Sequence, residues 1–355
     1  MNKLTKRISI IFSLVFMIIL SSTEVSAAKI PTKTIAKCSD KMSSTLYNKG
    51  LSVKCNGANL ECTFYRSMKK YTILKLEIIQ QYSIVKEQEG KFDKYGKAKI
   101  SIDLAEIKDA VYDVIIYQGY GYTENDENGY ITSEHYTSSG GAEFCIKLSN
   151  GVVKVYSPAG KSEEDFIKYV SSKYKKPKNI KIPWYLESAL KNKDIKTKTK
   201  KIIAGCRNDK EKVKAINDWL AENIYYDYES LIKNNIYNAA DPIKVFKTRH
   251  AVCSGYSRLA RIMFYHAGIP CLNVTGHAVN GTIKPNKLYK KIRSNHEWNL
   301  VYVNKKWHIL DITWDSNNEY FGKGNKENVS GKPNHTYYGI NPIQFGVNHV
   351  SMTVQ

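Results

Sequence analysis

The sequence lacks several features that would assign it to a common class of protein. It has no CxxC pair, no internal repeat and only 9 prolines in 355 residues. Without CxxC, neither a thioredoxin-type redox centre nor a zinc ribbon has support. The one strongly apolar run, from Ile8 to Leu20, is 13 residues long, whereas about 20 are needed to cross a bilayer. With 42% hydrophobic residues, the chain is neither disordered nor collagen-like, and its length predicts two domains at roughly 150 residues each.

Acidic residues are few relative to basic ones. Asp and Glu number 33 against 54 Lys and Arg, which gives a formal net charge of +21. Nearly all of the excess is lysine, which suits general attraction to anions better than the bidentate phosphate contacts that arginine makes. This excess of lysine reflects either a general bias in composition or an adaptation to anionic cell-wall polymers. A nucleic-acid binder is disfavoured because no arginine–aromatic motif accompanies the charge.

Residues 1–27 have the pattern of a signal peptide. A basic start precedes the apolar run, and Val25-Ser26-Ala27 offers a small-residue cleavage site. Cleavage would remove three basic residues and one acidic residue, so the net charge would fall from +21 to +19. The prediction is an exported protein, secreted or associated with the cell wall or surface, without a stable membrane anchor. The alternative is an uncleaved anchor.

Export changes how the cysteines are interpreted, because disulfides are permitted outside the reducing cytosol. The count of 7 is odd, so at least one thiol is left over. Cys38, Cys55 and Cys62 cluster near the start of the mature chain and could supply one local bridge, with its partners left open.

The first half of the mature chain is predicted to be β-rich. Apolar and β-branched residues fill Tyr71 to Tyr82 and Ala110 to Tyr117, and Asn150-Gly151 between two apolar runs is a strong hairpin pattern. Short strands separated by turns indicate a sandwich or a small barrel. We place this β-rich domain, of unknown role, at residues 28–170.

After a lysine-rich linker at 171–184, residues 185–355 are predicted to form a second domain with more helix. Asn208 marks a helix start, followed at helical spacing by Val213, Ile216, Leu220 and Ile224. The fold class is therefore α+β, with a β-rich, sandwich-like domain in front of a helix-containing one.

Cys253 lies where a loop passes into a helix. The helix dipole at such a position favours thiolate over thiol by roughly 0.3–1 kcal/mol when exposed, and the thiolate is the nucleophile. We expect Gly255, two residues on, to leave room for a substrate backbone beside the sulfur. Taken alone the pattern is weak, because a cysteine at a helix start is more often inert packing.

A predicted hairpin supplies partners for that cysteine. His296 to Val303 and Lys306 to Trp314 flank Asn304-Lys305, a two-residue turn that sets Trp298 opposite Asp311. His296 then projects from the same face as Asp311, one diagonal step away. The carboxylate would orient the imidazole and stabilise its protonated form. A slip of one residue would put the two side chains on opposite faces.

Short motifs follow one another between Lys210 and Phe321, and their order and spacing are more specific than any one of them. In chain order they are Glu211–Leu220 ahead of Tyr226-Asp227, Val252–Ser257, Gly268–Cys271 with Val274–Gly276, His296–Asn299, and Trp307 with Asp311–Asp315. The set resembles the transglutaminase-like superfamily, whose active site is a papain-like Cys, His and Asp. Two departures are small: Ala251 stands where glycine is usual, and Glu297 where alanine is common.

The resemblance implies a C-terminal transglutaminase-core domain in which a nucleophile helix packs on an antiparallel sheet. It assigns Cys253 as nucleophile, His296 as general base and acid, and Asp311 as the orienting carboxylate, with no cofactor and no metal. Backbone N–H groups at the helix start, including that of Cys253, would hold the oxyanion. His250 is a rival base without a carboxylate partner nearby in sequence, and His277 a potential secondary group.

The implied chemistry is acyl transfer from a protein or peptide amide, through a thioester, to an amine or to water. A cysteine peptidase of cell-surface or wall proteins is the alternative. A function without catalysis, as a surface- or wall-binding scaffold, is a further alternative. A degenerate active site usually loses at least one of its three catalytic residues, whereas this sequence keeps all three.

Overall fold

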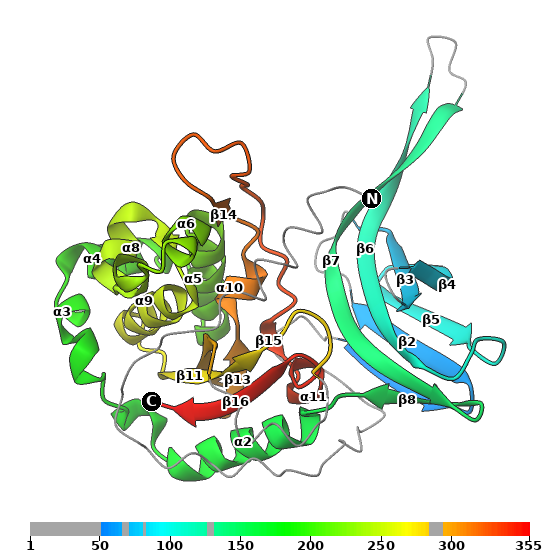
Figure 1. Cartoon of the computed structure of the whole chain (residues 1–355), viewed down its shortest axis with the longest axis horizontal. Coiled ribbons are helices and arrows are strands. Elements are labelled where there is room, and N and C mark those ends of the chain that lie inside the picture. Colours follow the sequence, from blue (N-terminus) through cyan, green and yellow to red (C-terminus); the bar gives the residue numbers. More distant parts are fainter. Residues whose placement is uncertain (1–50, 66–70, 81–82, 126–130, 284–293) are drawn as a thin grey trace.

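The structure, a computed structural model, describes residues 51–65, 71–80, 83–125, 131–283 and 294–355. The predicted signal peptide at 1–27 and Cys38 lie outside these residues. Figure 1 shows a β-rich part on one side and a mixed helix and sheet part on the other. In the described part of the chain, no helix is both long and apolar enough to cross a membrane.

The β-rich part is a pair of antiparallel sheets packed face to face. The five-stranded sheet has the spatial order β4 (Ser83–Lys91), β3 (Ile73–Gln80), β6 (Val111–Asn125), β7 (Ile131–Ser149), β8 (Val152–Tyr156). The three-stranded sheet has the order β1 (Leu51–Asn56), β2 (Asn59–Tyr65), β5 (Lys97–Asp103). Alternate residues of both sheets form one buried hydrophobic cluster. The sandwich-like prediction is therefore confirmed.

The Asn150-Gly151 hairpin is also confirmed. Ser149 pairs with Val152, and the two turn residues have φ angles of 52° and 69°. Positive φ at both turn positions is the geometry that the right-handed twist of the strands requires.

The C-terminal part is built on a second five-stranded antiparallel sheet. Its spatial order is β15 (Tyr338–Ile340), β13 (Lys306–Leu310), β12 (His296–Val303), β11 (Cys271–Ala278), β16 (His349–Val354). A small parallel sheet lies beside it, in the order β10 (His250–Ala251), β9 (Tyr225–Asp227), β14 (Glu319–Tyr320). The strand pairing in these two sheets fixes the relative positions of the chain segments that flank the candidate site described below.

The helices pack on this sheet, on the small sheet or on one another. They are α2 (Gly160–Lys173), α3 (Glu187–Leu190), α4 (Lys193–Ile202), α5 (Asp209–Asn223), α6 (Tyr228–Ile232), α7 (Tyr237–Ala240), α8 (Pro242–Thr248), α9 (Cys253–His266), α10 (Ile312–Asp315) and α11 (Pro342–Phe345). Helix α9 packs on β11 and β12, and α2 packs on β13 and β16. The predicted start of α5 is confirmed, since Asn208 Oδ1 accepts a hydrogen bond from the Glu211 N–H at 3.0 Å.

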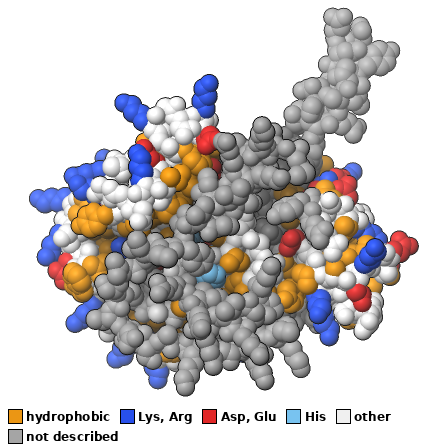
Figure 2. Space-filling view, in the orientation of Figure 1, with side chains coloured by type: hydrophobic (Ala, Val, Ile, Leu, Met, Phe, Trp, Pro, Cys, Tyr) orange, Lys and Arg blue, Asp and Glu red, His pale blue; other side chains and the backbone are white. Residues whose placement is uncertain are grey.

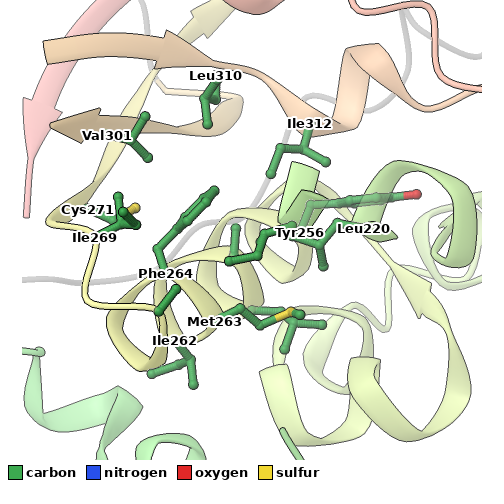
Figure 3. Close-up of a cluster of buried hydrophobic side chains, with 14 of the residues drawn as sticks. Leu220, Tyr256, Ile262, Met263, Phe264, Ile269, Cys271, Val301, Leu310 and Ile312 are labelled. Carbon is green, nitrogen blue, oxygen red and sulfur yellow. The ribbon is translucent and has the colours of Figure 1, made fainter. Parts of the chain in front are cut away.

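Helix α9 forms the centre of the C-terminal core. Its Tyr256, Met263 and Phe264 are completely buried, and Figure 3 shows Tyr256 beside Leu220 of α5 and Phe264 directed toward the sheet that carries Val301. Burial of each such side chain contributes about 1.5–3 kcal/mol. The first residue of α9 is Cys253, so this packing fixes the position of the predicted nucleophile.

The two parts of the molecule share a packed interface formed by α2 and α11. Phe166 and Val170 of α2 belong to the same hydrophobic cluster as Phe345 of α11. The Ser157 hydroxyl, just after β8, donates to the carbonyl of Ile343, a residue that also contributes to the sandwich core. The domain boundaries near residues 170 and 185 stay predictions.

A buried carboxylate ties α2 to strand β16 of the C-terminal sheet. Glu163 of α2 accepts hydrogen bonds from the backbone N–H of Ser351, at 2.7 Å, and from the Ser351 hydroxyl. Burial raises the pKa of Glu163 to about 7, although both hydrogen bonds act in the opposite direction. In the folded state the carboxyl group therefore keeps its proton to higher pH than in the unfolded chain.

We expect Glu163→Gln to make the free energy of unfolding less dependent on pH. Between the unfolded pKa near 4.5 and the folded pKa near 7, the folded state holds a proton that the unfolded state has lost. Stability of the wild type therefore falls as pH rises through this window, by about 1–3 kcal/mol for this group. Urea unfolding at pH 4.5 and 7.5 would measure the difference between variant and wild type. Glu164→Gln, on the next residue of the same helix, is the control and should leave the dependence unchanged.

Among the described residues, no disulfide joins Cys55 to Cys62, so that pairing of the predicted local bridge is absent. Cys55 and Cys62 lie on the adjacent strands β1 and β2, but their register partners are Leu60 and Val53. Any bridge to Cys38 lies outside the described residues.

Candidate functional site

Cys253 is placed by the small parallel sheet and by the start of α9. Strand β10 ends at Ala251, which pairs with Tyr226 of β9, and Val252 then begins the helix with extended backbone angles. The side chain of Cys253 is 8% exposed. The sequence prediction that this cysteine opens a helix is confirmed.

The prediction for Gly255 is wrong. A Cβ atom at this position would lie 2.1 Å from the carbonyl oxygen of Ala239 and 2.9 Å from the Val245 side chain. Glycine is therefore required for close packing of α9 against α7 and α8, on a side of the helix filled by protein and not by substrate.

The hairpin has the predicted register. Val303 pairs with Lys306 and Asn299 with Leu310 across a turn at Asn304 and Lys305, whose φ angles are 51° and 63°. Continuing the register by one step sets Trp298 opposite Asp311, as expected.

His296 and Asp311 meet in this arrangement. His296 Nε2 lies 2.6 Å from Asp311 Oδ2, and both side chains are buried. The Nε2–H group donates to the carboxylate, so Nδ1 is the ring nitrogen left for proton exchange with another group.

That other group is Cys253. Burial alone lowers the pKa of His296, but the charge and hydrogen bond of Asp311, together with a hydrogen bond to Cys253, raise it to about 10. The structure therefore brings together the three residues named from the sequence. The negative charge of Asp311 favours a protonated imidazole between the Cys253 side chain and the carboxylate.

Asp311 is held by more than His296. Its Oδ1 accepts a hydrogen bond from the Trp314 N–H at 3.2 Å, which caps helix α10, and its Oδ2 lies 3.2 Å from His349 Nε2. Burial would raise the pKa of Asp311, but His296 and His349 together hold it well below its usual value. The carboxylate is therefore charged and oriented at the same time.

His349 was not found by sequence reasoning. It lies in β16, paired with Ala278, and no short motif surrounds it. The sequence around His349 indicates only an apolar strand that carries one histidine. Such a pattern does not distinguish a residue of the active site from a residue of the core.

Backbone donors lie next to the sulfur. The Val252 carbonyl accepts from the N–H groups of Gly255 and Tyr256, as in a normal first helical turn. Among the described residues, no hydrogen bond from the N–H groups of Cys253 and Ser254 is present. These two groups can therefore donate to an oxyanion formed at the thiol.

Tyr226 lies close enough to the same thiol for the two groups to interact electrostatically. Burial raises the pKa of Tyr226, and the negative charges of Cys253 and Asp311 raise it further. The ring packs edge-on against Tyr228, at 4.8 Å between centroids, and Tyr228 stacks on Phe321. An aromatic wall therefore flanks the site.

The unusual Glu297 has a structural explanation. It is buried on the face of β12 away from His296, where Asn273 donates to it at 3.1 Å and Arg258 of α9 lies at 3.5 Å. It ties the nucleophile helix to the sheet and leaves the predicted site unchanged.

The other histidines take different roles. His250 is half-buried and stacks on Tyr320 at 3.7 Å between ring centroids. His308 is buried, lies 3.2 Å from the Val303 carbonyl, and has its pKa lowered to about 4 by burial. The charge of His277 contributes to the lowered pKa of His349, so His277 lies near the site.

His296, Asp311 and His349 also satisfy a simple geometric test for a metal site, with ligand atoms all within 4.8 Å of one another. An ion bonded to them at about 2.0–2.2 Å would have to replace the 2.6 Å hydrogen bond between His296 and Asp311. The cluster is explained by hydrogen bonding, and no metal was expected there from the sequence.

The chain is similar to known proteins over the part that carries this site. The sequence model of the Transglutaminase-like superfamily matches residues 196–312, a range that includes Cys253, His296 and Asp311. Kyphoscoliosis peptidase of Mus musculus is 26% identical over 171 residues, which is 47% of this chain and 26% of that protein. The Homo sapiens protein of the same name is 29% identical over 115 residues, 32% of this chain and 17% of that protein. The chain thus matches about a quarter or less of the length of these curated relatives.

Among solved structures, a TGase is 24% identical with a TM-score of 0.30, covering 51% of this chain and 46% of its own. Red sea bream transglutaminase is 11% identical with a TM-score of 0.26, covering 86% and 56%. Scores of this size are too low to define a common overall fold. Because of the sequence match, residues 196–312 are assigned to the transglutaminase-like superfamily. They form the core of a mixed helix and sheet region that follows a β-rich region.

Proposed function

We propose that the protein is a thiol enzyme that attacks amide groups of proteins or peptides and forms a thioester on Cys253. The proposal depends on one observation: the His296 ring bonds Asp311 at 2.6 Å and interacts with the Cys253 thiol, which contributes to the raised pKa of the ring. Three groups that act together in thiol catalysis therefore meet from helix α9, strand β12 and the end of strand β13.

The first half-reaction forms the thioester. The Cys253 thiolate attacks the amide carbonyl carbon, a C–S bond forms, and the carbonyl π electrons move to oxygen. The N–H groups of Cys253 and Ser254 stabilise this oxyanion. When the oxyanion collapses, the C–N bond breaks and His296 gives its proton to the departing amine.

The second half-reaction releases the acyl group. Water or a primary amine gives a proton to His296 as it attacks the thioester carbonyl, and the C–S bond breaks to restore the thiolate. Transfer to water is hydrolysis, and transfer to an amine is cross-linking. The curated relatives are named peptidases, which favours water for this chain.

Export and a cell-surface location complete the proposal. They depend on the predicted signal peptide and on the lysine excess of the sequence. Figure 2 shows Lys and Arg side chains spread around the visible face instead of gathered in one patch. Such a distribution suits diffuse attraction to anionic wall polymers, which should weaken as salt is added.

A casein assay tests the reaction class. The mature protein would be incubated with casein and a fluorescent primary amine, and both amine incorporation and peptide release would be followed. Peptide release is the expected main product, and amine incorporation in its place would identify a transferase. If neither product forms while Cys253 is intact and reduced, the non-catalytic scaffold becomes the better explanation.

A further inference from the structure

The Asp311 carboxylate has a second buried imidazole as a neighbour. His349 Nε2 lies 3.2 Å from the same oxygen, Oδ2, that binds His296 Nε2 at 2.6 Å. Core packing by itself does not require a ring nitrogen directed at a carboxylate, and an apolar ring would fill the space without a polar contact.

The His349 ring is fixed in place from several sides. It is 0% exposed and stacks on Phe345 at 4.0 Å with an interplanar angle of 15°. The rings of Trp314 and Trp298 meet it nearly edge-on, at 4.5 and 5.4 Å between centroids. Its strand, β16, pairs with β11. The nitrogen that faces Asp311 is therefore held with little freedom.

Its surroundings set its charge. The groups around His349 are Asp311 before α10, His296 on β12 and His277 on β11. Burial and the charges of the two histidines lower the pKa of His349 to about 4, although Asp311 acts in the opposite direction. At neutral pH the ring is therefore uncharged and has one N–H group.

The other ring nitrogen of His349, Nδ1, has a neighbour that is compatible with an uncharged ring whose one N–H group is at Nε2. His349 Nδ1 lies 2.6 Å from Asn348 Oδ1, and Asn348 Nδ2 donates to the Tyr337 hydroxyl at 2.8 Å. Turning this amide over by 180° places its NH2 group at Nδ1 and its oxygen at the Tyr337 hydroxyl, which can donate to it. In that orientation the N–H of His349 is at Nε2 and donates to Asp311.

We propose that His349 is a positioning residue of the thiol site, which holds the Asp311 carboxylate against His296 through an Nε2–H hydrogen bond. This inference rests on the function proposed above and adds a fourth residue to it. His349 touches neither the thiol nor a substrate and acts only through Asp311. Loss of its hydrogen bond would let the carboxylate turn and would weaken the support that Asp311 gives to the His296 imidazolium.

The test uses two variants that differ mainly in the hydrogen bond. His349→Gln can place an N–H group where Nε2 was, whereas His349→Met has the same length and no donor. Both lose the ring, so the loss of aromatic packing is shared. His349→Phe is a second donor-free variant that keeps a ring against Phe345.

The readout is the rate at which iodoacetamide alkylates Cys253, followed by mass spectrometry between pH 4 and 11. The alkaline inflection of this rate marks loss of the proton from His296. We expect His349→Gln to keep the wild-type inflection, and the Met and Phe variants to shift it to lower pH. Turnover of casein should fall about tenfold or more in the donor-free variants, in the range usual for outer residues of a site.

Two results are contrary to the proposal, and they are distinguishable. If the Gln, Met and Phe variants share one inflection, His349 only fills space and the inference fails. If wild-type Cys253 is alkylated no faster than the half-buried Cys206, the thiol is not activated and the proposed function fails first. The melting temperature of each variant shows whether it is folded during the measurement.

Discussion

Replacing Cys253 by alanine is expected to abolish turnover of amide substrates while the protein stays folded. The substitution removes one sulfur atom from a buried side chain, which is 8% exposed. The expected cost in stability is about 1 kcal/mol. The covalent route disappears with the sulfur, and activity should fall at least about 10³-fold, toward what binding and the oxyanion donors alone provide. Peptide release or amine incorporation with casein measures the loss.

Cys271→Ala is the matched control. Cys271 is also buried, at 5% exposed, and lies on β11, where Asn299 Nδ2 approaches its sulfur at 3.5 Å. Burial raises the pKa of its thiol to about 12, so it is protonated and unreactive at neutral pH. This variant should keep its activity. Equal loss in both variants would show that a thiol is needed for the fold and not for the chemistry.

The hairpin was predictable because its geometry is local. Asn304 and Lys305 both take positive φ, and a two-residue turn leaves one register for the strands that follow. Because side chains alternate along a strand, that register decides which residues share a face with His296. The start of α5 was predictable for the same reason, since the Asn208 cap acts within one turn.

Contacts between segments far apart in the sequence were not predictable. His349 reaches Asp311 only because β16 crosses the sheet to pair with β11. Gly255 faces Ala239 because α7 and α8 pack beside α9, whereas the sequence offers no sign of which side of the helix they cover. In both cases tertiary packing, and not local pattern, decides the role of the residue.

Replacing Asp311 by asparagine is the second change with a large expected effect. Asp311 Oδ2 faces two ring nitrogens while Oδ1 accepts from the Trp314 N–H. An asparagine has one acceptor oxygen, so it cannot serve both sides. Either the cap of α10 is lost, at about 1 kcal/mol, or the histidines face an NH2 group.

In either case the negative charge beside His296 is removed. That charge is the main reason why the pKa of His296 is raised to about 10 despite burial, so in Asp311→Asn the imidazolium should lose its proton at lower pH. We expect the alkaline inflection of Cys253 alkylation to move down by about one pH unit or more, since one unit corresponds to ~1.4 kcal/mol. Casein turnover at neutral pH should fall about 10–10³-fold, because a misoriented imidazole that is less strongly protonated no longer supports the thiolate.

Asp218→Asn is the control that makes this result specific. Asp218 Oδ1 lies 2.6 Å from His335 Nε2, the same separation as in the His296–Asp311 pair. Loss of this second pair should lower stability without moving the Cys253 profile, because no thiol shares its histidine. If both variants gave the same alkaline inflection, the charge of Asp311 would not act on His296, and Cys253 would be a buried thiol without an activating partner.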